Sequence, residues 1–257
     1  MFIYTKKEVK SFLIASILLS FVFAFNDGRD VFELAYWLSN FAKVFVIVLI
    51  GLIVHDMGHD FVVRKQGFNS EFKTWGLKKL NLKAHDTFPK EVKFFGLKIK
   101  LEQFPLGVLM ALGVMLFSNG KLYWAAVSSY NLIKIKAHRI GRKFEDVTDF
   151  EQAKIAFAGP FALLLLTIIF KIFNSSGMFD KAIFIYSVMI VYDMLPLPEL
   201  DGFKVFMGSR PFFVFSLLFT IVAILLLHTT SAFVTLAVSL LVAIVALVAY
   251  MYYFIYK

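Results

Sequence analysis

Long apolar stretches separated by charged segments dominate this chain of 257 residues. Seven such stretches cover residues 11–25, 34–54, 104–118, 155–173, 182–197, 211–227 and 231–255. Hydrophobic residues make up 60% of the chain, above the roughly 45–50% of an average soluble domain. Because a helix needs about 20 apolar residues to cross a bilayer, we predict an all-α polytopic membrane protein. One domain is expected over residues 1–257, since no repeat or Pro/Gly/Ser-rich linker divides the chain.

The charges between the apolar stretches predict the orientation of the chain. Three lysines precede the first stretch, and residues 64–103 carry ten Lys/Arg against four Asp/Glu. Cytoplasmic loops of membrane proteins carry such an excess of basic residues, whereas residues 26–33 hold three acidic residues and one arginine. We therefore expect a multi-pass protein of the cell membrane with both termini on the cytoplasmic side.

Residues 104–127 are expected to enter the membrane and return to the same side. If residues 104–118 crossed completely, residues 119–154 with their seven Lys/Arg would be exported, against the positive-inside bias. Asn119-Gly120 is a typical hairpin turn, and it lies between the strand-like runs 114–117 and 122–124. The expected fold is thus about six transmembrane helices plus a re-entrant β-hairpin-like element.

Cysteine count and net charge narrow the classes of function. Without cysteine the chain has no disulfide, no thiolate metal site and no cysteine nucleophile. Its net charge is +9, but the basic runs at 78–100 and 134–143 are expected to face anionic lipid headgroups. The expected partners are therefore the lipid bilayer and transmembrane protein substrates, and not nucleic acid.

The pentapeptide His55-Asp56-Met57-Gly58-His59 follows the second apolar stretch at its predicted cytoplasmic end. Histidines four residues apart lie on one face of a helix, where both imidazoles reach the same zinc ion. The H-E-x-x-H pattern of metalloproteases has this spacing and uses its glutamate as the general base. Asp56 stands at the glutamate position. The pentapeptide therefore predicts a metal site.

A second segment, from Asp193 to Gly202, is predicted to supply the third protein ligand that a zinc site needs. It ends an apolar stretch that crosses the membrane in the same direction as the histidine-bearing stretch, so Asp201 is expected at a similar depth. Pro196 and Pro198 are expected to break the helix and expose backbone groups that pair with an extended substrate. Gly202 is expected to give the turn that presents Asp201 an unusual backbone conformation.

In this order, the two motifs resemble those of the site-2 protease family, the intramembrane zinc metalloproteases. That family pairs H-E-x-x-H on one transmembrane helix with N-x-x-P-x-x-x-L-D-G on a later one. Here the second motif reads Asp193-x-x-Pro196-x-x-x-Leu200-Asp201-Gly202.

A third match to the family is Ala158-Gly159-Pro160, which is expected to open the intervening helix and, by the resemblance, to pack closely against the metal-binding helix. The resemblance covers residues 45–205. The helices expected at 11–25, 211–227 and 231–255 are peripheral to it.

The resemblance implies a role for each motif residue. His55, His59 and Asp201 would bind one Zn²⁺, Asp56 would be the catalytic general base, and Asp193 would stand where the family has an asparagine that positions substrate or stabilises the oxyanion. The implied activity is hydrolysis of peptide bonds within or next to transmembrane segments of substrate proteins, with the active site opening near the cytoplasmic face.

Asp56 and Asp193 both depart from the family pattern. Aspartate in place of glutamate withdraws the carboxylate by about 1.5 Å, one C–C bond, and such a misplacement can cost on the order of 100-fold in rate. Asp193 lacks the NH₂ donor of asparagine and puts negative charge where an oxyanion would develop, unless it has taken over the role of base. Two alternatives to a protease stay open: an inactive relative that binds zinc and transmembrane helices without cleaving them, and a metal-ion transporter.

Overall fold

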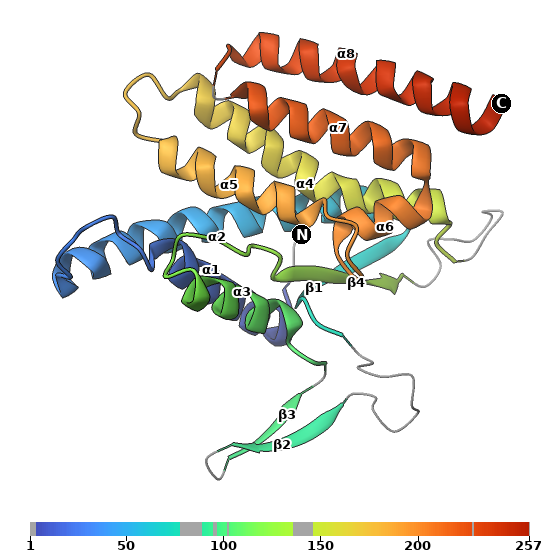
Figure 1. The fold of residues 1–257 in the computed structure, drawn as a ribbon. Coiled ribbons are helices and arrows are strands. Elements are labelled where there is room, and N and C mark those ends of the chain that lie inside the picture. The colour runs from blue at the N-terminus through green and yellow to red at the C-terminus, as the bar shows by residue number, and fades with distance from the viewer. Residues whose placement is uncertain are drawn as a thin grey trace.

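The computed structural model describes residues 4–77, 89–94, 97–101, 103–135, 146–227 and 229–256 (Figure 1). In chain order the described elements are α1 (Lys6–Ala24), α2 (Leu34–Lys65), β1 (Phe68–Thr74), β2 (Lys90–Phe94), β3 (Leu97–Leu101), α3 (Leu106–Phe117), β4 (Ser128–Lys134), α4 (Asp149–Ile172), α5 (Asp180–Asp193), α6 (Asp201–Gly208), α7 (Arg210–Leu227), α8 (Ala232–Met251) and a terminal π-helical turn (Tyr252–Tyr256). Parts of both basic runs, residues 78–88 and 136–143, lie outside the described residues.

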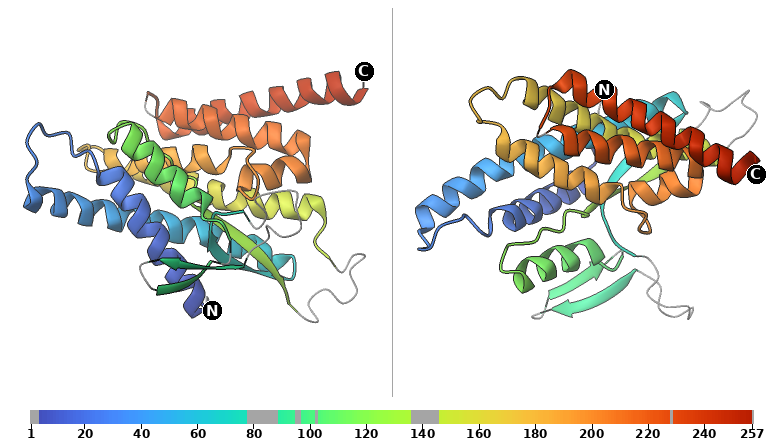
Figure 2. Two further views of the ribbon diagram at one scale, coloured as in Figure 1. Left: turned by 60° about the horizontal axis from the view of Figure 1, so that its bottom comes forward. Right: turned by 45° about the horizontal axis from the view of Figure 1, so that its top comes forward.

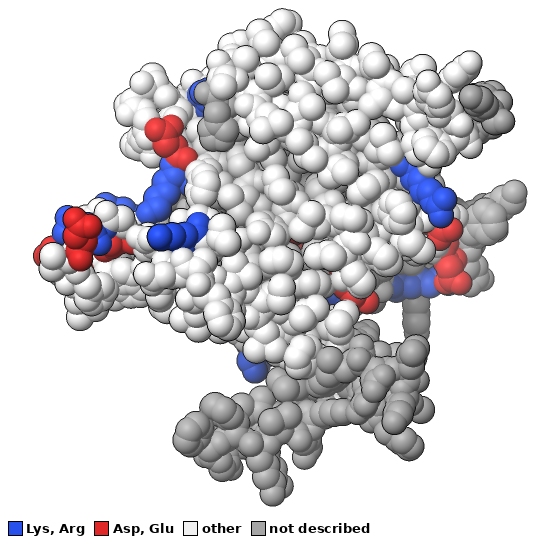
Figure 3. Space-filling model, viewed as in Figure 1, with Lys and Arg blue, Asp and Glu red and all other residues white. Residues whose placement is uncertain are grey.

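Four described helices are long and apolar enough to cross a membrane: Leu34–Lys65, Asp149–Ile172, Arg210–Leu227 and Ala232–Phe254. The surface agrees with this, because Figure 3 shows a broad uncharged area, with Lys, Arg, Asp and Glu at its left and right ends and along its lower edge. The molecule is therefore a helical, membrane-embedded protein.

The other two predicted spans are weaker. Helix α1 includes residues 11–24 of the stretch 11–25 but begins with three lysines and a glutamate among its first five residues. Helix α5 has 14 residues and is therefore about 21 Å long at 1.5 Å per residue, less than the ~30 Å hydrocarbon core. The described part of the chain thus has four membrane-length helices, and the count of six stays a prediction.

The helices form one packed body around α2, which carries the pentapeptide 55–59. Helix α2 packs against α4 on one side and against α1 on the other, while α7 and α8 pack on each other at the far side of α4. Figures 1 and 2 show the β2–β3 hairpin projecting away from this body. Strands β1 and β4 pair antiparallel, from Phe68 opposite Lys134 to Thr74 opposite Ser128, and β1 packs against α1 and α2.

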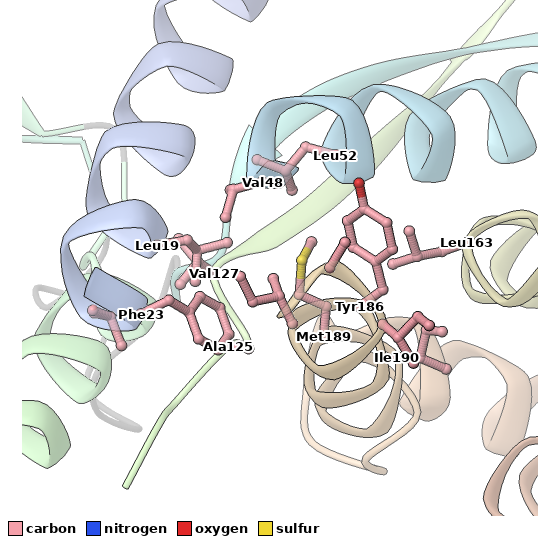
Figure 4. Packing of buried hydrophobic residues seen from close by; sticks show 14 of the residues in the cluster. Leu19, Phe23, Val48, Leu52, Ala125, Val127, Leu163, Tyr186, Met189 and Ile190 are labelled. Carbon is pink, nitrogen blue, oxygen red and sulfur yellow. The ribbon is translucent and has the colours of Figure 1, made fainter. Parts of the chain in front are cut away.

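Tyr186 of α5 occupies the centre of the main apolar core (Figure 4). Its ring is fully buried beside Leu163 and Ile190, and its hydroxyl donates a 2.9 Å hydrogen bond to the carbonyl of Ile47. Gly51 allows this fit, since a Cβ there would lie 2.6 Å from Cε1 of Tyr186. The core thereby fixes α5, which ends at Asp193, against α2, which carries the two histidines.

The prediction of a β-hairpin over residues 104–127 is wrong. Residues 106–117 form helix α3, and Asn119 and Gly120, both with positive φ, end it: their N–H groups bond to the carbonyls of Leu116 and Met115. This pattern is the Schellman motif, which uses the same Asn-Gly signal as a hairpin turn. The two ends of the segment 104–127 nevertheless lie close together, because both bond to Trp75. Gly107 N–H donates to the Trp75 carbonyl, and Trp75 N–H donates to the carbonyl of Val127.

Candidate metal centre

Helix α2 carries both histidines on one face. It continues past the apolar stretch to Lys65, so the pentapeptide lies within the helix. The two imidazole rings are 4.7 Å apart, and both side chains are buried. Gly159 of α4 gives them room, since a Cβ there would lie 2.5 Å from Cε1 of His59 and 2.8 Å from Nε2 of His55. The predicted close packing of Gly159 against the metal-binding helix is thus present.

Helix α4 also orients one of the imidazoles. Nδ1 of His59 donates a 2.7 Å hydrogen bond to the carbonyl of Ile155, which leaves Nε2 as the nitrogen that faces the site. Contrary to the prediction, Pro160 does not open this helix but lies inside it: the helix begins at Asp149, where Thr148 and Glu151 form a capping box. The apolar stretch does not include the polar first turns of the helix.

The break between α5 and α6 brings Asp201 to the histidines. Pro196 and Pro198 lie in this break, as predicted, but the carbonyl of Pro198 already accepts a 2.8 Å hydrogen bond from the indole of Trp75. The next carbonyl, that of Glu199, accepts a 2.6 Å bond from Ser129. The segment therefore fastens Asp201 to the β1–β4 sheet and does not leave these carbonyls free for a substrate.

Gly202 matters for a different reason from the one predicted. Its φ is not positive, and it lies in the first turn of α6. A Cβ at this position would overlap the backbone carbonyl of Met194 at the end of α5. Glycine thus lets the start of α6 pack directly on the end of α5, which sets the position of Asp201.

The three predicted ligands converge. Oδ2 of Asp201 lies 3.0 Å from Nε2 of His59 and 3.2 Å from Nε2 of His55, and the three ligand atoms all lie within 4.8 Å of one another. Tetrahedral zinc with bonds near 2.05 Å would separate its ligand atoms by about 3.3 Å. The buried Nε2 of His55 makes no hydrogen bond with any described residue. This group could hold a metal ion, and its spacing fits one.

Charge on Asp201 suits that role. Burial alone would raise the pKa of its carboxyl, but the neighbouring His59, His55 and Lys204 outweigh it and hold the pKa well below the usual range. Lys204, one turn later in α6, is buried with Nζ 3.6 Å from Oδ1 of Asp201. Burial lowers the pKa of Lys204 to about 8, with Asp201 acting in the opposite direction.

Asp193 lies beside the ligand group, whereas the Asp56 side chain bonds elsewhere. Oδ2 of Asp193, at the end of α5, lies 3.2 Å from Nε2 of His55. Asp56 points to another face of α2, where its Oδ2 accepts a 3.2 Å hydrogen bond from the hydroxyl of Tyr4. It lines a cavity of about 290 Å³ together with Tyr4, Glu8, Asp60, Ser70 and Glu71, and none of the three ligand residues lines that cavity.

Sequence reasoning missed three residues of the site. Lys204 is a lysine in an apolar context at i+3 from Asp201, a spacing that could have indicated contact on one helix face. The ring of Tyr130 in β4 lies 4.4 Å from that of His59, and Tyr4 reaches Asp56 across 52 positions. For these two tyrosines the sequence carries no local signal, because their contacts depend on tertiary packing.

No family model, curated protein or solved structure matches this chain. The resemblance to site-2 proteases therefore rests on the two motifs and on their order in the chain.

Proposed function

We propose that this protein is a membrane-embedded zinc metallopeptidase that hydrolyses a peptide bond within or beside a transmembrane segment of another protein, near the cytoplasmic face. One observation carries the proposal: His59 on α2 and Asp201 at the start of α6, 142 positions apart, meet with His55 in a buried group whose spacing fits a metal ion. Two imidazoles and one carboxylate leave a fourth position for water, as in catalytic zinc sites.

Each side chain has a role in this reaction. His55, His59 and Asp201 would hold the zinc ion, which when bound supplies Lewis acidity to the scissile carbonyl and the attacking water. Asp56 accepts a proton from that water as the new C–O bond forms, and returns it to the leaving amine as the C–N bond breaks. The polar cavity beside Asp56 is a place from which water can reach this carboxylate.

The outer edge of β4 is the proposed docking place for an extended substrate. Trp75 N–H donates to the Val127 carbonyl and Ile135 N–H to the Gly67 carbonyl. The backbone N–H and C=O groups of the odd-numbered residues of β4 therefore point toward β1. The backbone groups of Tyr130 and Leu132 therefore point away from β1, and the Tyr130 ring lies against His59. An extended chain that pairs with this edge would lie close to the ligand group.

A second candidate is a zinc-binding membrane protein that binds transmembrane helices without cleaving them. It is favoured by the position of Asp56, which is hydrogen-bonded to Tyr4, and by the Asp193 carboxylate beside His55, where negative charge opposes an oxyanion. If this candidate is right, Asp56→Glu combined with Asp193→Asn should create cleavage activity that the parent lacks. A parent that already cleaves would exclude it.

The experiment that tests the proposal is a survey of new protein termini in membranes from cells that express the parent or His55→Ala. The proposal expects new termini inside or beside transmembrane segments in the parent only. His228 provides the matched control, since His228→Ala changes a histidine outside the motifs and should leave the parent's new termini in place. No parent-specific termini from a zinc-loaded protein would overturn the proteolytic function and favour the second candidate.

A further inference from the structure

Lys204 is a buried lysine whose ammonium contacts the metal-ligand group. It lies one turn after Asp201 in α6, with 9% of its surface exposed. Its Nζ is 3.6 Å from Oδ1 of Asp201, whereas Oδ2 of the same carboxylate faces both imidazoles. The lysine thus attracts the oxygen that the histidines do not contact.

The same ammonium holds strand β4. Nζ lies 3.2 Å from Oγ of Ser129 and 3.4 Å from the carbonyl oxygen of Tyr130, and it sits 3.5 Å from the centre of the Tyr130 ring. That ring in turn lies 4.4 Å from the ring of His59. Lys204 therefore contacts one member of the ligand group, Asp201 on α6, and one neighbour of that group, Tyr130 on β4.

An ammonium so deeply buried is costly unless several partners compensate for its lost hydration. Here the partners are a carboxylate, a hydroxyl, a carbonyl and an aromatic face, and one of them is a metal-ligand carboxylate. Removing a group that holds a metal ligand from behind typically changes metal affinity or activity by about 10- to 100-fold.

We propose that Lys204 is a positioning residue of the metal centre: it turns Asp201 so that Oδ2 faces the two histidines, and it holds the Tyr130 ring against His59. The inference rests on the metal site of the proposed function. In addition, one side chain, that of Lys204, fixes both the outer edge of β4 and the ligand carboxylate. A substrate strand that pairs with the Tyr130 carbonyl would therefore compete with Lys204 for that carbonyl.

The test compares parent, Lys204→Met and Lys204→Arg in detergent, by zinc affinity from chelator competition and by the visible absorption of the cobalt-loaded protein, which reports ligand geometry. Lys204→Met should bind zinc about 10- to 100-fold more weakly and change the cobalt spectrum, and Lys204→Arg should restore both in part. Lys154→Met is the control: it removes a lysine whose ammonium lies over the ring of Phe150 in α4 and not at the ligand group, and it should keep the parent's zinc affinity and spectrum.

The outcomes separate this inference from the proposed function. A Lys204→Met protein with the parent's zinc affinity and cobalt spectrum overturns the positioning role alone, whereas a parent that binds no metal overturns both. If Lys204→Met does not fold, Lys204→Gln is measured in its place, since its amide can still donate to the Tyr130 carbonyl. Weak zinc binding by that variant supports the role, and parent-like binding overturns it.

Discussion

One methyl group added at Gly159 should expel metal from the site while the helices stay in place. In Gly159→Ala the new Cβ would lie 2.5 Å from Cε1 of His59 and 2.8 Å from Nε2 of His55. Unstrained contacts of this kind are about 3.5–4.0 Å, so each ring must withdraw by about 1 Å. The obstructing atoms belong to side chains that can rotate, and the strain therefore falls on the ligand positions.

The size of the effect follows from this displacement. Adding a methyl group to a well-packed site costs typically about 1–3 kcal/mol, and metal–ligand distances tolerate only about 0.2 Å. To bind zinc, the two imidazole rings must move back into contact with the new methyl group. The packing cost is then subtracted from the free energy of zinc binding. At about 1.4 kcal/mol for each tenfold change, zinc affinity should fall about 5- to 150-fold.

The assay is zinc affinity by chelator competition in detergent, read together with thermal unfolding. Gly113→Ala is the control, because it adds the same methyl group to helix α3 at a position where the new Cβ would meet nothing within 4 Å. It should leave zinc affinity unchanged. Parent-like zinc affinity in Gly159→Ala would show that the two rings do not hold a metal ion beside Gly159.

Substitutions at two further positions test contacts near the site. Tyr4→Phe removes the hydrogen bond to Asp56 and should lower the free energy of unfolding by about 0.5–1.5 kcal/mol without loss of zinc; a zinc-free variant would contradict the assignment of Asp56 as a residue that does not bind the metal. Glu199 has a φ of 72° and forms a 2.7 Å ion pair with Lys73. Both Glu199→Ala and Glu199→Gly lose this pair, but only glycine releases the strain, so the glycine variant should be more stable by about 1 kcal/mol. Equal melting temperatures would show that this backbone conformation is not strained.

Local sequence patterns predicted the helix faces and the ligand group well. The spacing of His55 and His59 set both imidazoles on one face of α2, and Pro196 and Pro198 ended α5 as expected. The contact of Asp201 with the histidines could be predicted only from the expectation that the apolar stretches 34–54 and 182–197 end at a similar depth in the membrane. It depends in the structure on Gly202, whose missing Cβ allows α6 to pack on Met194.

Other features could not be predicted because one local signal serves two structures. Asn119-Gly120 ends a helix through a Schellman motif as readily as it turns a hairpin, and only the apolar helix before it decides between them. Pro160 lies within α4 because a capping box at Thr148 starts the helix earlier. Contacts such as that of Lys204 with Tyr130 bring together residues 74 positions apart and follow from the packing alone.

The most direct test of the account is the metal content of purified, detergent-solubilised protein by elemental analysis, with Asp201→Ala measured beside the parent. We expect about one zinc per chain in the parent and a loss of that zinc in the variant, because two imidazoles alone do not complete a zinc site. A folded parent without zinc, or a variant that keeps it, would contradict the three-ligand centre formed by His55, His59 and Asp201.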